Sequence, residues 1–177
     1  MNVWTVGHSN RTFDELVALL EAHGIRGLAD VRTVPRSRRH PHFNTEELAA
    51  SLPERGIAYS HHPDLGGFRR PRPDTPNDAW ENEAFRGYAD HAMSATFAAA
   101  LADLRDLAAE RPTAVMCAEA VWWRCHRRVI SDRLVAAGDD VLHIASETRA
   151  DPHSITEFAV VGADGQITYP SPQLRLG

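Results

Sequence analysis

The sequence predicts a single α/β domain in which a mainly parallel β-sheet is flanked by helices on both faces, with a C-terminal β-hairpin. Short apolar segments alternate along the chain with segments whose apolar residues recur at helical spacing. The connections are short, and strands that are linked through helices pair in parallel. A chain of 177 residues has the length of one domain, and no repeat or linker divides it. We therefore expect one domain over residues 1–177.

The first half of the chain contains three predicted strands and two predicted helices. The segment 3–9 is an apolar strand that ends in polar residues. The following helix opens with Thr12 and Glu15 at the spacing of a capping box, and Gly24 ends it. The next elements are a strand over 27–34, a helix over 44–56 and a strand over 57–65.

The second half begins with a loop over 66–82 that is rich in glycine, proline and arginine. Phe68 precedes the arginines of this loop and Trp80 follows them, a combination that suits stacking on bases and contact with phosphate. We interpret the loop as a lid or a strand-contacting loop. The elements after it are a helical region over 83–110 that is interrupted near 88–91, a strand over 113–119, a helix over 124–138, a strand over 140–146 and a hairpin over 157–170 with Asp164-Gly165 at its turn.

The basic side chains are unusual in kind, because all 19 are arginine and the chain has no lysine. The guanidinium group is a planar fork that suits carboxylate and phosphate. The net charge of −5 argues against a protein that coats DNA over a wide face. No apolar run reaches the roughly 18 residues that span a bilayer, and the N-terminus does not resemble a secretory signal. Two cysteines do not make a disulfide framework, so we expect a cytoplasmic protein without membrane attachment.

Polar, ionisable or glycine-rich sequence follows four of the predicted strands. Ligands of parallel sheets bind beyond the carboxyl ends of the strands, where successive loops meet. We therefore predict one shared site at this edge of the sheet. Its candidate residues, strand by strand, are His8, Ser9, Asn10 and Arg11; Asp30, Arg32, Arg36 and Arg38; Asp64, Gly66 and Gly67; and Cys117, Glu119, Trp122, Arg124, Cys125, His126 and Arg127.

Three of these residues are candidates for proton transfer. A carboxylate at a buried strand end can act as a general acid or base when desolvation or an arginine partner tunes it. Glu119 and Asp30 occupy such positions in the predicted strands, and a structural salt bridge is the alternative role for Glu119. His8 is the acid/base candidate of the first loop. Ser9 and Asn10 are expected to hydrogen-bond to a ligand or to the turn itself.

The other polar candidates are assigned to substrate binding. Arginine side chains and free backbone N–H groups at the start of a helix form a seat for phosphate or carboxylate. Arg124 and Arg128 would share one helix face while Arg127 points elsewhere, so the three do not all meet one anion. Trp122 is a candidate for stacking on an extruded base.

Cys117 and Cys125 are eight positions apart, which matches neither a zinc ribbon nor a redox motif. Cys125 is expected in the first turn of a helix beside Arg124 and His126, where the helix N-terminus and cations lower the pKa of a thiol. We interpret both cysteines as small packing residues. A nucleophile or a metal site is the alternative, but no cofactor or metal is predicted.

Several stretches in a fixed order resemble one family. They are TVGHSNRTFDELVALL, DVRTVPRSRRHPHFN, GIAYSHHPDLGG, FRGYADHA and MCAEAVWWRCHRRVISDRL, which together with VLHI cover residues 5–144. On these motifs the chain is similar to the bacterial and archaeal domain-of-unknown-function family four-eight-eight. The resemblance implies an α/β fold and a common polar site, but no agreed activity. The segment 120–124 departs from the family pattern, in which relatives often hold a proline and charged residues, and the hairpin lies outside it.

We predict an enzyme that acts on an anionic, phosphate-bearing substrate, a nucleotide or a nucleic-acid base site, by acid/base hydrolysis. No dinucleotide-binding or Walker loop is present, so hydrolysis is the simplest reaction. One alternative is a module that binds nucleic acid without turnover, which would tolerate a Glu119→Gln substitution that abolishes turnover in the enzyme. Another is a thiol or metal protein that uses Cys117, Cys125 and His126. The expected partner is thus an anionic small molecule or a nucleic acid, and no oligomeric state is predicted.

Overall fold

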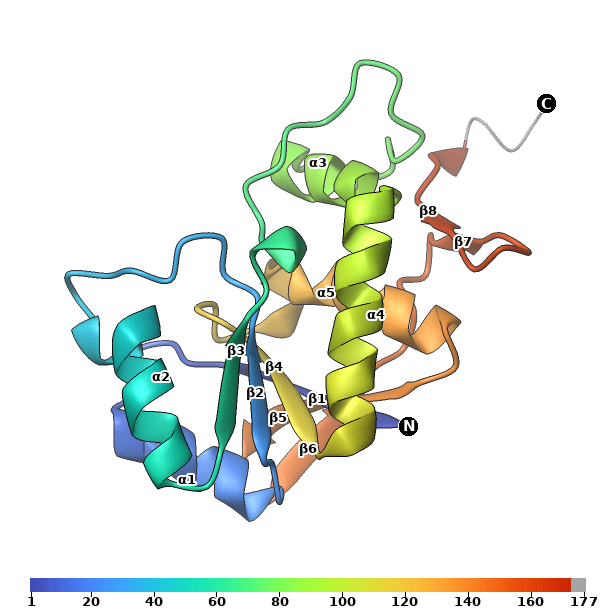
Figure 1. Cartoon of the computed structure of the whole chain (residues 1–177). Coiled ribbons are helices and arrows are strands. Elements are labelled where there is room, and N and C mark those ends of the chain that lie inside the picture. The colour runs from blue at the N-terminus through green and yellow to red at the C-terminus, as the bar shows by residue number, and fades with distance from the viewer. Residues whose placement is uncertain (173–177) are drawn as a thin grey trace.

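The structure, a computed structural model, describes residues 1–172 and contains a six-stranded sheet in the order β3-β2-β4-β1-β5-β6 (Figure 1). The five strands from β3 to β5 are parallel, and β6 pairs antiparallel with β5. This mainly parallel sheet confirms the predicted α/β class. The strands are β1 (Asn2–Gly7), β2 (Gly27–Asp30), β3 (Ala58–His61), β4 (Thr113–Cys117), β5 (Asp140–Ser146) and β6 (Arg149–Pro152).

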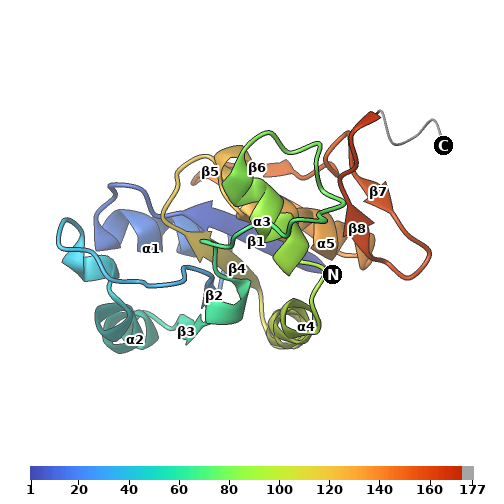
Figure 2. The ribbon, with the colours of Figure 1, turned by 90° about the horizontal axis from the view of Figure 1, so that it is seen from above.

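Helices cover both faces of the sheet, as the sequence predicts. In Figure 2, which looks along the strands, α1 (Phe13–Ala22) and α2 (Thr45–Glu54) lie on one side of the sheet. The helices α3 (Glu83–His91), α4 (Ala95–Glu110) and α5 (Arg127–Ala136) lie on the other side. Because side chains alternate along a strand, β1, β2, β4 and β5 each supply residues to both cores.

The alternation is clear in β4, where every residue is buried. Ala114 and Met116 pack with α1 and α2, whereas Val115 and Cys117 pack with α3, α4 and α5. A strand that is buried on both faces reads as a continuous apolar run, as expected for the centre of a parallel sheet. The strand therefore places Cys117 at the carboxyl end of the sheet, on the face that α5 covers.

The predicted start of the first helix is confirmed. The Thr12 side chain accepts a hydrogen bond from the Glu15 backbone N–H, and the Glu15 carboxylate accepts one from the Thr12 backbone N–H. This reciprocal pair satisfies two N–H groups that have no partner inside the helix. Gly24 follows the helix with a φ of 68°, a left-handed conformation that favours glycine.

The structure differs from the predicted elements at several boundaries. The predicted interruption of the helical region over 83–110 is present but falls after residue 91 rather than within 88–91, because Ser94 caps a new helix by accepting a hydrogen bond from the Phe97 N–H. The strand β6 was not predicted. The helix expected from residue 124 begins at Arg127, and a 3₁₀ turn, Trp122–Arg124, precedes it. Cys125 is therefore outside the helix, and Arg124 does not share a helix face with Arg128.

The predicted C-terminal hairpin is present as β7 (Val160–Val161) and β8 (Ile167–Thr168). Tyr169, just after the hairpin, is buried against the α5 side of the core. Its hydroxyl donates to the Asp132 carboxylate over 2.8 Å, and its backbone N–H donates to the Asn77 side chain over 2.9 Å. These contacts join the end of the described chain to α5 and to the 66–82 loop. Within residues 1–172 no helix has both the length and the apolar character needed to cross a membrane.

Candidate functional site

A cavity of about 880 Å³ opens at the carboxyl ends of β1, β2 and β4. It lies where parallel sheets bind their ligands, at the edge where successive strand-to-helix loops meet. Its lining includes eleven of the residues predicted from sequence, namely His8, Ser9, Asn10, Arg32, Arg36, Gly67, Cys117, Glu119, Arg124, Cys125 and His126.

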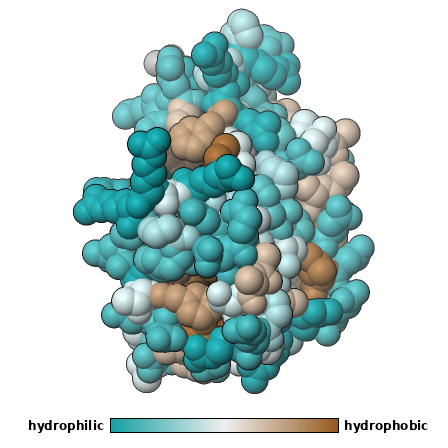
Figure 3. All heavy atoms as spheres, turned by 60° about the vertical axis from the view of Figure 1, so that its left-hand side comes forward, coloured by the Kyte–Doolittle hydropathy of each residue, from teal (hydrophilic) through white to brown (hydrophobic). Residues whose placement is uncertain are grey.

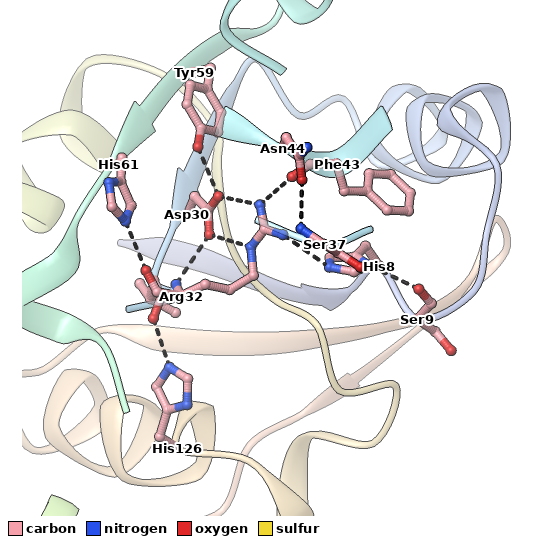
Figure 4. A network of polar contacts seen from close by, with 11 residues as sticks. His8, Ser9, Asp30, Arg32, Ser37, Phe43, Asn44, Tyr59, His61 and His126 are labelled. Carbon is pink, nitrogen blue, oxygen red and sulfur yellow. Dashed lines mark hydrogen bonds and ion pairs between the residues drawn. The ribbon is translucent and has the colours of Figure 1, made fainter. Parts of the chain in front are cut away.

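A buried ion pair between Asp30 and Arg32 supports one wall of the cavity (Figure 4). The Arg32 Nε and Nη2 atoms donate to the two carboxylate oxygens over 2.9 and 2.6 Å. Tyr59 donates its hydroxyl to the same carboxylate over 2.8 Å, and Arg32 also donates to the Phe43 carbonyl oxygen over 2.6 Å. Both Asp30 oxygens are thus occupied, and the carboxylate is fully buried. This geometry suits a structural role for Asp30 better than the predicted proton transfer.

His8 belongs to the same network. Its Nδ1–H donates to the Ser9 carbonyl oxygen over 2.8 Å, so its Nε2 is left to accept from Arg32 Nη1, 3.3 Å away (Figure 4). Burial is the main cause that lowers the pKa of His8 to about 4, and the Arg32 charge acts in the same direction. His8 is therefore neutral at pH 7, and both of its ring nitrogens are engaged.

Glu119 lies on an exposed loop at the edge of the cavity. The buried strand ends at Cys117, two residues earlier than predicted, so the Glu119 side chain is not desolvated in the strand as the sequence led us to expect. Its carboxylate accepts a long hydrogen bond of 3.4 Å from the Val121 N–H. Within the described part of the chain Glu119 forms no salt bridge, the alternative role considered for it. It remains available to a ligand in the cavity.

Arg127 and Gly7 hold the backbone of the loop that carries Glu119 in place. The buried Arg127 guanidinium donates to the carbonyl oxygens of Glu119 and Ala120. A Cβ atom at Gly7 would lie 1.9 Å from the Glu119 carbonyl oxygen, so only glycine fits at the end of β1. The Arg127 side chain, predicted to bind substrate, instead positions the loop that carries the predicted acid.

Cys117 and Cys125 meet at the floor of the cavity although eight positions separate them in sequence. Their sulfur atoms are 3.0 Å apart and share a hydrogen bond. That bond, together with burial, raises the pKa of Cys117 well above its ordinary value. Burial alone would raise the pKa of Cys125 as well, but the bonds to Cys117 and His126 outweigh it and hold this pKa well below its ordinary value.

His126 completes the cluster. Its Nε2 is 2.9 Å from the Val31 carbonyl oxygen, which can only accept, so Nε2 carries the proton (Figure 4). Nδ1 lies 3.7 Å from the Cys125 sulfur, where it donates to a thiolate when the ring carries a second proton and presents its lone pair when the ring is neutral. The ligand atoms of the two cysteines and His126 all lie within 4.8 Å of one another, and all three residues line the cavity.

Arginine side chains make the cavity wall basic. Arg39 and Arg124 are exposed, and neither forms an ion pair with any residue between 1 and 172. Arg36 pairs with Glu46 over 2.8 Å, but both side chains are largely exposed, so this pair contributes little and yields readily to another anion. Glu119 is the one acidic side chain in the lining described by the structure.

Apolar side chains stand at the cavity rim. Phe68 is 94% exposed and has a φ of 59°, a conformation rare for a bulky residue. The Thr33 hydroxyl and the Arg69 guanidinium hold its neighbours by donating to the carbonyls of Gly67 and Gly66. Val34 is 67% exposed in the same lining. Large exposed apolar side chains are few among residues 1–172. On the face drawn in Figure 3, hydrophobic residues form small patches among hydrophilic ones.

The remaining predicted site residues do not line the cavity. Arg11 donates to the Gly7 carbonyl oxygen, and Gly66 packs against Thr33. Trp122 stacks on the ring of His143, with centroids 4.1 Å apart, so one of its faces is already covered. Arg38 is exposed outside the lining, and Asp64 lies in the 3₁₀ turn Pro63–Leu65.

Sequence reasoning did not select several lining residues, among them Thr33, Val34, Ser37, Arg39, His40, Phe85 and Tyr88. A signal existed for Arg39, which belongs to the same arginine-rich loop as Arg36. Phe68, which the sequence analysis considered for base stacking together with the loop arginines, does line the cavity. Tyr88 and Phe85 come from α3, and no local pattern distinguishes their cavity-lining faces from core positions.

A family model described as Domain of unknown function DUF488 matches residues 12–134. No curated protein and no solved structure was found to match the chain. The matched span contains the loops after β2, β3 and β4. It therefore includes the exposed arginines of the cavity, Arg36, Arg39 and Arg124 (the arginine wall), and the cysteine cluster. It covers well over half of the sequence and agrees with the motifs noted above. The chain thus belongs to the DUF488 family.

Proposed function

We propose that the protein is an enzyme for an anionic, phosphate-bearing substrate, and that the cluster of Cys117, Cys125 and His126 carries its chemistry. The observation behind this proposal is that exposed arginine side chains and the cysteine cluster line the same cavity. Exposed guanidinium groups without partners are suited to bind phosphate through charge-assisted hydrogen bonds. The ligand they hold would share the cavity with the two sulfurs.

The choice of reactive group follows from which side chains are free to react. Asp30 is fully occupied by Arg32 and Tyr59, and His8 is neutral with both nitrogens engaged. The sulfur of Cys125 lines the cavity with a lowered pKa. A thiolate beside an imidazole is the usual arrangement of reactive cysteines. The geometry therefore favours the thiol alternative over hydrolysis by buried carboxylates.

The rim supports a substrate with a flat ring. Phe68 is held outward in a strained conformation, and strain of this kind is typical of functional sites. Stacking of a base on an aromatic side chain contributes about 1–3 kcal/mol. A ring on Phe68 and a phosphate on the arginine wall fit a nucleotide or an unpaired base of a nucleic acid, and the cavity is large enough for a ligand of nucleotide size.

Two neighbouring arginines offer a matched test of the binding step. Arg39 lines the cavity and Arg38 does not, although both are exposed. We expect Arg39→Ala and Arg124→Ala each to weaken the binding of nucleoside monophosphates about tenfold, measured by calorimetry, because one hydrogen bond to a charged group contributes about 1.5 kcal/mol. Arg38→Ala should have no effect. Equal effects of the Arg38 and Arg39 substitutions would contradict the proposed site.

A second comparison separates the chemical alternatives. With a panel of nucleotides and single-stranded oligonucleotides as probes, we expect Cys125→Ser to abolish turnover while binding stays within about twofold, since serine keeps the size of the side chain. Glu119→Gln should retain turnover. The reverse pattern would support acid/base hydrolysis by Glu119. Arginine-dependent binding without turnover of any probe would support the nucleic-acid-binding module.

A further inference from the structure

We propose that Cys117, Cys125 and His126 form a binding site for a zinc-class divalent metal ion, with a fourth coordination position open to the cavity. The inference deepens the proposed function and rests on it only for what the metal would act upon. Two thiolates and one imidazole are a ligand set that zinc and similar soft ions prefer over magnesium or calcium. Three protein ligands with one open position are typical of catalytic zinc sites rather than structural ones.

The distances between the ligand atoms are close to those that the ion requires. With zinc–sulfur bonds of about 2.3 Å, tetrahedral coordination places the two sulfurs about 3.8 Å apart. The sulfurs of Cys117 and Cys125 are 3.0 Å apart, so binding requires them to separate by less than about 1 Å. The distance of 3.7 Å from the Cys125 sulfur to His126 Nδ1 already fits such a site.

The hydrogen bond made by Nε2 of His126 orients the ring so that Nδ1 can bind the metal. Histidines that bind metals almost always donate their other N–H to a carboxylate, a carbonyl or water, which fixes the ring and its tautomer. His126 makes this bond to the Val31 carbonyl oxygen, so the Nδ1 lone pair of the neutral ring faces Cys125. A Cβ atom at Gly67 would lie 3.3 Å from the same nitrogen, so glycine leaves the space beside it open.

The charges around the cluster are compatible with an ion of charge 2+. Two thiolates neutralise it, and binding releases the proton of Cys117 to solvent, together with any proton left on Cys125. Of the buried arginines, Arg32 is paired with Asp30, whereas Arg127 donates to the carbonyl oxygens of the Glu119 loop and its charge also lowers the pKa of both cysteines, which favours their thiolate forms. A metal-bound water at the open position would supply a nucleophile at neutral pH for a substrate held by the arginine wall.

The same two sulfurs are also close enough to be linked as a disulfide, and the experiment must separate the outcomes. We would purify the full chain under reducing conditions, remove metals with a chelator, count free thiols, and titrate Co²⁺ alone. The expected result is one equivalent of tightly bound Co²⁺ with a thiolate-to-cobalt charge-transfer band and the visible absorption of a tetrahedral ion. Addition of Zn²⁺ should abolish this spectrum by displacement.

Substitutions of the three residues test which side chains bind the metal ion. Cys117→Ser and Cys125→Ser should each lose most of the charge-transfer band, and His126→Gln should keep the band but weaken Co²⁺ binding at least about tenfold. The matched control is His23→Gln, because His23 lies after α1 and contacts the Ser146 carbonyl oxygen, away from the cavity. Circular dichroism would show that each variant is folded, and the wild-type titration decides the question if one cysteine variant is not.

The outcomes separate this inference from the proposed function. Two free thiols without a cobalt spectrum would overturn the metal site. If nucleotide binding in that case still depends on Arg39 and Arg124, the proposed function stands without a metal. If instead the ion binds through the three ligands but the two arginine substitutions leave nucleotide binding unchanged, the metal site stands and the proposed function falls.

Discussion

The buried His143 provides a sharp test of the electrostatics of this fold. Its side chain is stacked under Trp122, its Nδ1 contacts the Thr5 hydroxyl over 2.7 Å, and its Nε2 contacts His153 Nδ1 over 2.9 Å. Burial is the main cause that lowers the pKa of His143 from 6.5 to about 3, and the charges of His153 and Arg127 act in the same direction. The folded protein therefore keeps this ring neutral, whereas the unfolded chain protonates it below pH 6.5.

The two pKa values of His143 determine how the stability of the fold changes with pH. Because the unfolded state binds the extra proton, the stability that His143 contributes is complete above pH 6.5 and is lost progressively as the pH falls towards 3. At pH 5 the unfolded side chain is almost fully protonated and the folded one is not, so the loss between pH 7 and pH 5 is about 2 kcal/mol, at about 1.4 kcal/mol for each pKa unit.

The assay is urea denaturation at pH 7 and pH 5. In His143→Gln, the amide oxygen can accept from the Thr5 hydroxyl and the amide nitrogen can donate to His153, so we expect a folded variant. Its free energy of unfolding should fall by about 2 kcal/mol less than that of the wild type between the two pH values. Val141→Ala, a cavity-forming change on the same strand, should lower stability equally at both. An unchanged pH dependence in His143→Gln would refute this account.

Three further substitutions test other parts of the structure. Asp30→Asn should lower the free energy of unfolding by about 3–5 kcal/mol in urea denaturation, because it leaves the buried Arg32 charge unpaired; a loss below about 1 kcal/mol would contradict the importance of the pair. Gly7→Ala should displace the Glu119 loop, whose carbonyl oxygen lies 1.9 Å from the new Cβ atom, and weaken nucleotide binding measured by calorimetry; unchanged affinity would show that the loop position is unimportant. Asp90→Ala should speed limited proteolysis within 66–82, since the Asp90 carboxylate anchors this loop through three hydrogen bonds, and equal cleavage rates would exclude that role.

Much of the fold could be predicted because its signals are local. The Thr12–Glu15 capping box and the alternation of apolar strands with amphipathic helices are properties of short segments, and both are found in the structure. The strand β6 gave no such signal. Its residues, Arg149–Pro152, have low β-propensity, and they form a strand only because β5 offers an unpaired edge beside them.

The start of α5 could not be predicted for a similar reason. The apolar spacing and the arginines near residue 124 are compatible with a helix, but the chain first makes the 3₁₀ turn Trp122–Arg124. There Trp122 packs on His143, which belongs to β5 and lies far away in sequence. A tertiary contact thus decides the local conformation, and it moves Cys125 and His126 out of the helix to the floor of the cavity.

The meeting of the two cysteines shows most clearly what a spacing rule misses. Motif spacings describe chains whose ligands lie on one short turn, but Cys117 ends a strand and Cys125 follows a separate turn. What joins them is the loop between them, which folds back because Arg127 binds its carbonyl oxygens from inside and Gly7 leaves room for it. Neither Arg127 nor Gly7 looks like part of a thiol site in the sequence, since Arg127 is predicted to bind substrate and Gly7 reads as an ordinary strand-ending glycine. The reactive cluster therefore depends on a buried cation and a missing Cβ atom, and changes at these two positions should disturb the sulfurs without touching them.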